Sequence, residues 1–226
     1  MADTDVPTAV PFVPETTNLD KVREAAAGCR GCHLYRDATQ TVFGEGPPDA
    51  RVVMVGEQPG DIEDRRGHPF VGPAGKVLDR AITEAGLDRT KTYVTNAVKH
   101  FKHKPAAPGK RRIHQTPDRT EIVACRPWLV AEFALLHPQA VVALGATAAK
   151  ALLGPSFRVT KSRGVLLAWP DAAYHPEDFV GEVHDGAFVL ATIHPSAVLR
   201  ADDREEAYAG LVADLTVVAK ALAGRA

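Results

Sequence analysis

Short runs of consecutive apolar residues recur along the chain and predict buried strands. Each run is a few residues long and gives way to a glycine or to polar residues, as strands covered on both faces do. These runs occupy residues 51–55, 92–98, 140–144 and 187–193. Residues 165–169 form a candidate extra strand.

Between these runs, apolar residues recur at helical spacing. The segment 73–86 (PAGKVLDRAITEAG) is typical, since its apolar positions share one helix face and a glycine closes it. Helices are expected at residues 19–27, 73–86, 119–136, 146–153 and 205–223. Strands that alternate with helices predict an α/β fold with a parallel sheet that is covered on both faces.

Composition and length agree with one soluble globular domain. The chain has 226 residues, of which 45% are hydrophobic and 24% charged, and its net charge is -1. No apolar run approaches the roughly 20 residues that span a bilayer, and no Lys or Arg precedes Lys21, so we expect a cytoplasmic, bacterial protein. Residues 1–18 are rich in proline and polar residues and are expected to be a flexible tail, with a single domain over 19–226.

Three polar clusters each follow a predicted strand directly. They are GEQPGD (56–61), NAVKH (96–100) and HPS (194–196). Because ligands bind at the carboxyl ends of parallel strands, we expect the three clusters to form one site.

Taken singly, the members of these clusters have simpler interpretations. Glu57, Gln58 and Asp61 lie in a Gly/Pro-bounded turn that could simply lead into a helix, and the turn lacks the pattern of a P-loop. Phe70 could pack in the core or stack on a flat ligand. Asn96 offers a donor and an acceptor together, and His194 is either a structural histidine or a donor to a developing oxyanion.

The cysteines have the spacing of a metal or redox site. Cys29 and Cys32 form a CxxC pair, Cys125 lies far downstream, and His100 is a candidate fourth ligand. A zinc ion held by three cysteines and a histidine fits these residue types, but so does a CxxC turn with an unrelated buried cysteine.

Positive charge is concentrated in one stretch. Residues 99–114 (KHFKHKPAAPGKRRIH) contain six Lys or Arg, three His and no acidic residue. Prolines and a glycine predict a loop, taken as residues 99–118. A basic loop beside a strand-end site suits contact with nucleic-acid phosphates, whereas a solvated charged loop is the alternative.

Together these segments resemble the uracil-DNA glycosylase superfamily, in particular its iron–sulfur (family 4) branch. The matching stretches are GCRGCHLY (28–35), VGEQPGDIEDRRGHPFVGPAGKVLD (55–79), VTNAVKH (94–100), CRPWL (125–129) and ATIHPSAVLR (191–200). The resemblance implies a three-layer α/β/α sandwich around a central, mainly parallel, four-stranded sheet. It also implies a [4Fe-4S] cluster, rather than zinc, on Cys29, Cys32, His100 and Cys125.

Three departures from the branch resemble its X-type variant, which excises uracil and stays attached to DNA through a loop histidine. Gln58 stands where a small residue is usual, His100 replaces a cysteine, and the longer loop carries KRRIH (110–114). His114 is then the nucleophile that attacks C1′ of the sugar. Glu57 would orient His114, while Gln58 and Asp61 would shape the turn.

The resemblance also assigns residues to the substrate. Phe70 would stack on a flipped uracil, Asn96 would read its O4 and N3–H, and His194 would donate toward O2, with Gln58 also in the uracil pocket. Contacts with DNA, single-stranded by preference, are expected from Lys102, Lys104, Lys110, Arg111, Arg112 and Ser196. The protein is expected to be a monomer. The alternatives are a conventional multiple-turnover uracil-DNA glycosylase and a non-enzymatic, metal-containing nucleic-acid-binding module.

Overall fold

The central sheet has four parallel strands and one antiparallel edge strand. The computed structural model describes residues 7–104, 112–169 and 185–224, and in this part the sheet order is β2-β1-β5-β7-β6. The neighbouring strands β2, β1, β5 and β7 run parallel, while β6 pairs antiparallel with β7. The strands are β1 (Val52–Gly56), β2 (Thr92–Asn96), β5 (Ala140–Leu144), β6 (Leu166–Ala168) and β7 (Phe188–Thr192).

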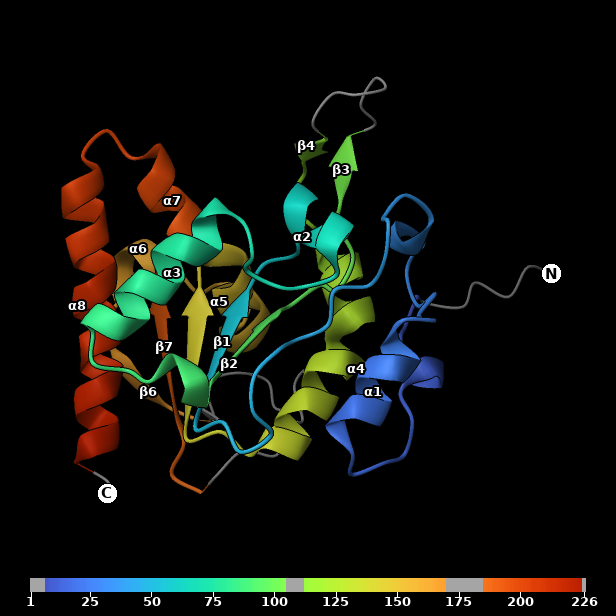
Figure 1. Cartoon of the computed structure of the whole chain (residues 1–226), viewed down its shortest axis with the longest axis horizontal. Coiled ribbons are helices and arrows are strands. Elements are labelled where there is room, and N and C mark those ends of the chain that lie inside the picture. Colours follow the sequence, from blue (N-terminus) through green and yellow to red (C-terminus); the bar gives the residue numbers. More distant parts are fainter. Residues whose placement is uncertain (1–6, 105–111, 170–184, 225–226) are drawn as a thin grey trace.

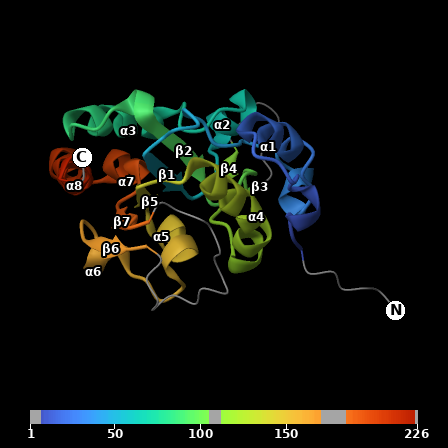
Figure 2. The same cartoon turned by 90° about the horizontal axis from the view of Figure 1, so that it is seen from below.

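Helices cover both faces of the sheet, which makes three layers (Figures 1 and 2). One layer contains α3 (Pro73–Glu84), α7 (Pro195–Arg200) and α8 (Arg204–Ala223), and the other contains α1 (Leu19–Ala26), α4 (Arg119–Leu136) and α5 (Ala146–Leu153). The short helices are α2 (Asp61–Arg66) and α6 (Val159–Ser162), with 3₁₀ turns η1 (Val10–Phe12), η2 (His33–Arg36) and η3 (Arg89–Lys91). In the described residues, no helix is both long and apolar enough to cross a membrane.

Alternation along the strands explains the two cores. In β1, Val53 and Val55 pack with the α1, α4 and α5 layer, whereas Val52 and Met54 pack with the α3, α7 and α8 layer. Successive strand side chains point to opposite faces, so a strand that is apolar at every position fills both cores. The α/β class and the layered architecture are therefore confirmed.

The structure adds detail that the sequence pattern did not give. The candidate strand at 165–169 exists as β6, so the sheet has five strands in the described residues, where four were expected. The helices at 119–136 and 146–153 have the expected bounds. α2, α6 and α7 were not predicted, because four to six residues are too few to display helical periodicity.

Part of the expected N-terminal tail is packed. Ala9 is 1% exposed, and its backbone N–H donates to Ala124 O on α4 over 2.8 Å. A Cβ at Gly31 would lie 2.7 Å from Ala9 Cα, so the CxxC segment and residue 9 are in close contact. Residues 1–6 lie outside the described part of the chain.

The stretch expected to be a basic loop forms a hairpin in its described part. β3 (His103–Lys104) pairs antiparallel with β4 (Ile113–His114), and His103 faces His114 in this register. Figure 1 shows the hairpin beyond the carboxyl ends of β1 and β2, close to α2. Residues 105–111 lie outside the described residues, and Lys110 and Arg111 are among them.

Candidate active site

The carboxyl ends of β1, β2 and β7 bring together the three polar clusters. Gly56, the last residue of β1, is paired in register with Asn96, the last residue of β2. Glu57 follows β1, and His194 follows β7 on the other side of β5. The sequence-based expectation of one shared edge is therefore met by the geometry.

The side chains of Asn96 and Phe70 both pack against the backbone of Gly56. A Cβ at this position would overlap Oδ1 of Asn96 and lie 2.7 Å from Cζ of Phe70. The Asn96 amide and the Phe70 ring thus approach the same point of the β1 backbone. Asn96 is 3% exposed and Phe70 is 9% exposed, so both side chains are largely shielded from water.

Phe70 is held in an unfavourable backbone conformation. Its φ is 56°, in the left-handed region that non-glycine residues rarely adopt. Its carbonyl packs so closely on Gly75 of α3 that no Cβ would fit there. The ring stacks on that of His194, with centroids 6.2 Å apart and planes 29° apart. Strain of this kind concentrates at functional sites. The ring also belongs to the core cluster that α3, α7 and α8 cover, so Phe70 packs in the core as well.

His194 is neutral and has a defined tautomer. Burial lowers its pKa to about 4. Its Nδ1 accepts a hydrogen bond from the Ser196 backbone N–H over 3.1 Å and lies 2.8 Å from the Ser196 hydroxyl. Because Nδ1 is an acceptor, the ring proton sits on Nε2, which can donate to a ligand.

Glu57 links the strand-end turn to the hairpin. Its Oε1 lies 3.2 Å from Nε2 of His114, and its Oε2 accepts a hydrogen bond from the Thr147 hydroxyl. Burial raises the pKa of Glu57, but the hydrogen bonds from His114 and Thr147 outweigh burial and lower the pKa overall. An ionised carboxylate therefore faces His114, whose side chain is 48% exposed and open to a substrate.

Gln58 and Asp61 bind the same hairpin at other points. The Gln58 amide accepts from Lys102 N over 2.9 Å and donates to Lys102 O and Gln115 O over 3.1 and 3.0 Å. Asp61 Oδ1 lies 2.6 Å from Nε of Arg112. The structure thus assigns these two residues to holding the hairpin, whereas Glu57 contacts His114 itself.

The basic stretch carries less available charge than its composition suggests. Lys99 is fully buried and paired with Glu132 over 2.6 Å, so it cannot contact DNA phosphates. Lys102 pairs with Asp118 and Glu121, at 3.2 and 2.8 Å. Arg112 pairs with Asp61 and with Asp64, the latter over 2.8 Å.

Two of the expected DNA contacts remain near the surface. Lys104 is exposed, and Ser196 lies beside His194 with Arg200 Nη1 donating to its hydroxyl over 3.1 Å. Lys110 and Arg111 lie outside the described residues.

The sequence analysis missed one strand end. Thr147 lies in the first turn of α5, just after β5 and Gly145, and its hydroxyl donates to Glu57. The signal was available, because a glycine and a hydroxyl residue follow a buried strand here as polar residues follow the other three.

The three cysteines are buried and close enough to interact electrostatically. Trp128 Nε1 and Gly31 N donate to Cys29 Sγ over 3.2 and 3.4 Å, and Lys99 N donates to Cys125 Sγ over 3.2 Å. Burial raises the pKa of Cys125 to about 12, with Cys32 and Cys29 contributing in the same direction. Buried sulfurs that accept N–H donors fit the ligand set of an iron–sulfur cluster.

His100 fits this set less directly. Its Nε2 lies 2.9 Å from the Thr41 hydroxyl, and burial lowers its pKa to about 4, which keeps the ring in the neutral form that binds metals. In the described residues, no three Cys, His, Asp or Glu side chains are placed to hold one metal ion.

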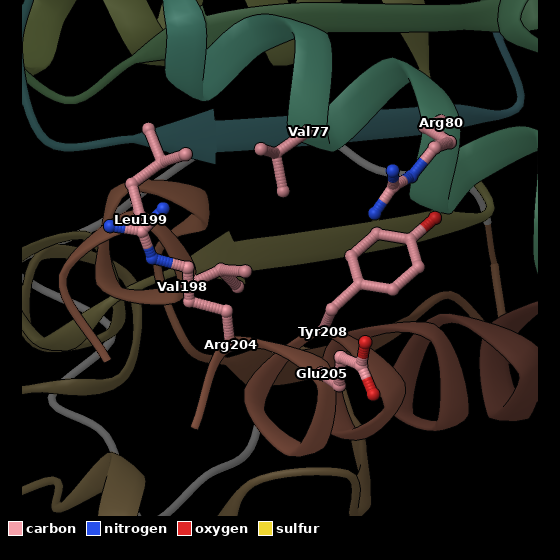
Figure 3. Close-up of a pocket in the computed structure, with 7 residues that line it drawn as sticks. All are labelled: Val77, Arg80, Val198, Leu199, Arg204, Glu205 and Tyr208. Carbon is pink, nitrogen blue, oxygen red and sulfur yellow. The ribbon is translucent and has the colours of Figure 1, made fainter. Parts of the chain in front are cut away.

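A separate pocket of about 420 Å³ lies between α3, α7 and α8 (Figure 3). The Arg80 guanidinium lies 3.9 Å from the centre of the Tyr208 ring, and the Tyr208 hydroxyl donates to Glu84 over 2.8 Å. These contacts join α3 to α8. The other lining residues are Val77, Val198, Leu199, Arg204 and Glu205.

A family model and several relatives from comparisons with known proteins indicate the same family. The model of the "Uracil DNA glycosylase superfamily" matches residues 43–216. The type-4 uracil-DNA glycosylase of Thermotoga maritima is 37% identical over 183 residues, which cover 80% of this chain and 83% of the relative. The type-4 uracil-DNA glycosylase of Sulfurisphaera tokodaii is 35% identical over 187 residues, covering 80% and 76%. That of Pyrobaculum aerophilum is 34% identical over 189 residues, covering 81% and 85%.

Proposed function

Since this chain belongs to the uracil DNA glycosylase superfamily, we propose that it excises uracil from DNA and becomes covalently linked through His114 to C1′ of the abasic site. The observation that carries the covalent step is the contact of His114 Nε2 with Glu57 Oε1, at 3.2 Å beside the strand-end site. A nucleophile held by a carboxylate at the edge of a base pocket is the arrangement that such a step requires.

Asn96, Phe70 and His194 would recognise the base. The Asn96 amide can donate to uracil O4 and accept from N3–H, a pattern that cytosine reverses, and the Phe70 ring offers a stacking surface. Leaving one buried polar group unpaired costs about 1–3 kcal/mol, so the wrong base is disfavoured. Gln58 was also expected in this pocket, but its amide is engaged with Lys102 and Gln115.

The bond changes balance as follows. The bond between C1′ and N1 of uracil breaks, and its electron pair leaves with the base, whose O2 receives a hydrogen bond from Nε2–H of His194. A lone pair of the neutral His114 ring forms the new bond to C1′. The resulting imidazolium gives its remaining N–H proton to Glu57 or to water, and the uracil anion takes a proton from water.

We include a [4Fe-4S] cluster on Cys29, Cys32, Cys125 and His100 in the proposal. Its support is the burial of the three thiols and the N–H groups that face Cys29 and Cys125. Such a cluster would supply structural cross-linking when bound. Trp128 and Lys99 orient two of the sulfurs from α4 and from the segment after β2.

The remaining expectations belong to the same proposal. Single-stranded DNA is the favoured substrate, with Lys104 and Ser196 as its contacts near the surface. Lys102 and Arg112 also belong to the expected contacts but are paired with carboxylates in this structure, and Lys110 and Arg111 lie outside the described residues. Monomeric state and cytoplasmic location stay predictions.

A denaturing gel tests the function directly. The protein is mixed with a uracil-containing single-stranded oligonucleotide, boiled in detergent and run beside a thymine-containing control. We expect a slow protein–DNA band with uracil only. Alkali-cleavable DNA without this band would indicate a conventional glycosylase, and unchanged DNA would indicate a binding module.

A further inference from the structure

Glu57 is held from two sides, by one residue of the hairpin and one residue of α5. His114 of β4 contacts its Oε1 over 3.2 Å, and the Thr147 hydroxyl of α5 donates to its Oε2. A carboxylate with only one of these contacts could rotate about its side-chain bonds. With both contacts, Oε1 faces His114 in a fixed direction.

The position of Thr147 follows from the end of β5. Gly145 has a φ of 90°, and a Cβ there would lie 2.9 Å from Cβ of His194. Its N–H donates to Thr192 O over 2.9 Å, which fixes the start of α5 against the end of β7. Because β5 also pairs with β1, the first turn of α5 places Thr147 beside Glu57.

Thr147 does not serve as a helix cap. The N-cap of α5 is Gly145, which makes no side-chain capping bond, and the Thr147 hydroxyl donates to Glu57 instead. A hydroxyl in a first helical turn ordinarily bonds to the backbone or to water, so this contact across elements calls for a separate explanation.

We propose that Thr147 is a positioning residue for the covalent step: it fixes the Glu57 carboxylate so that Glu57 aligns His114 with C1′. This inference rests on the proposed function. It extends the site to the end of β5, so that all four parallel strands contribute. Thr147 acts through Glu57 and has no contact with the base-reading residue Asn96 among its described hydrogen bonds.

Two substitutions separate the role of the Thr147 hydroxyl from that of its methyl group. Thr147→Val removes the donor and keeps the shape, whereas Thr147→Ser keeps the donor. In single-turnover cross-linking to a uracil oligonucleotide, we expect Thr147→Val to be slower by about tenfold and Thr147→Ser to stay within about twofold. Equal cross-linking rates for Thr147→Val and the unsubstituted protein would overturn the inference.

A double-mutant cycle separates positioning from a merely structural role. If Thr147 acts through Glu57, Thr147→Val added to Glu57→Gln should slow cross-linking no further, since the shared contact is already altered. Additive losses would overturn the inference.

The two proposals fail in different ways. If the unsubstituted protein forms no cross-link, the covalent function and the role of Thr147 fall together. If it does, and Thr147→Val matches its rate, only the role of Thr147 falls. Thermal unfolding of each variant shows that it is folded, and Thr147→Ser supplies the folded comparison if Thr147→Val is not.

Discussion

The backbone N–H of Ser196 donates to Nδ1 of His194 over 3.1 Å, and this bond decides which face of the histidine is chemically useful. The acceptor role of Nδ1 leaves the proton on Nε2. Burial lowers the pKa of His194 to about 4, so the ring donates as a neutral group at physiological pH. A neutral donor stabilises a departing anion without first having to be protonated.

The lowered pKa of His194 predicts a dependence of stability on pH. The folded-state pKa of about 4 lies below the ordinary histidine value of about 6.5, so the unfolded chain binds this proton more readily. The contribution of His194 to stability is fully present above the unfolded-state pKa and is lost as the pH falls toward the folded-state pKa. Between about pH 7 and about pH 5, His194→Asn should lose less stability than the unsubstituted protein, by about 1–2 kcal/mol in urea unfolding. Equal losses would contradict the assignment.

His114→Ala should abolish the cross-link but retain uracil release, because Asn96, Phe70 and His194 are untouched and water can reach C1′. The matched control is His103→Ala, the neighbour that faces His114 across the hairpin. Denaturing gels score the cross-link, and alkali cleavage scores release. A band that persists in His114→Ala would show that another group is the nucleophile.

Asn96→Asp should weaken the preference for uracil over cytosine. A carboxylate accepts from the N4–H₂ group of cytosine and cannot donate to O4 of uracil, so the ratio of release rates should fall by about tenfold or more. Release from matched uracil and cytosine oligonucleotides, both in the His114→Ala background, measures this ratio. An unchanged ratio would place base recognition elsewhere.

The Lys99–Glu132 ion pair predicts a large stability effect. Both side chains are fully buried, and Glu132 also accepts from Tyr93 and Thr95, each over 2.9 Å. Glu132→Leu leaves Lys99 buried without its counter-charge and should cost about 3–5 kcal/mol in urea unfolding. Arg89→Ala breaks the exposed pair with Asp79 and should cost at most about 1 kcal/mol. Similar losses for both variants would contradict the buried geometry.

The cluster proposal predicts loss of iron on ligand substitution. Cys125→Ser should lose bound iron and the absorbance at about 400 nm that iron–sulfur proteins show, while His103→Ala keeps both. His100→Ala should also lose iron if His100 is the fourth ligand. Full iron content in Cys125→Ser would show that Cys125 is not a cluster ligand. Zinc in place of iron in the purified protein would favour a zinc site over an iron–sulfur cluster.

Local sequence determined the elements that carry the site. The strands end at Gly56, Asn96 and Thr192, at the polar clusters where the sequence predicted that they would end. These ends could be predicted because the pattern of apolar residues that marks a strand depends only on a few neighbouring residues. The resemblance to the family supplied the candidate site residues, which lie together at the carboxyl ends of these strands. Short helices such as α2 and the pairing of β3 with β4 were not predicted, because two to six residues are too few to show a periodic pattern.

Only the tertiary structure decided what each charged or polar group does. The sequence suggested that Lys99 is part of a DNA-binding loop. In the structure, Lys99 is buried in an ion pair with Glu132, which lies 33 residues away in the sequence. Thr147 looked like an ordinary helix residue until the sheet brought it to Glu57, 90 residues away. The sequence by itself determined the layered fold and the edge of the sheet where chemistry gathers. Contacts between distant segments decided the partners, because electrostatic and hydrogen-bond energies depend on separation in space and not along the chain.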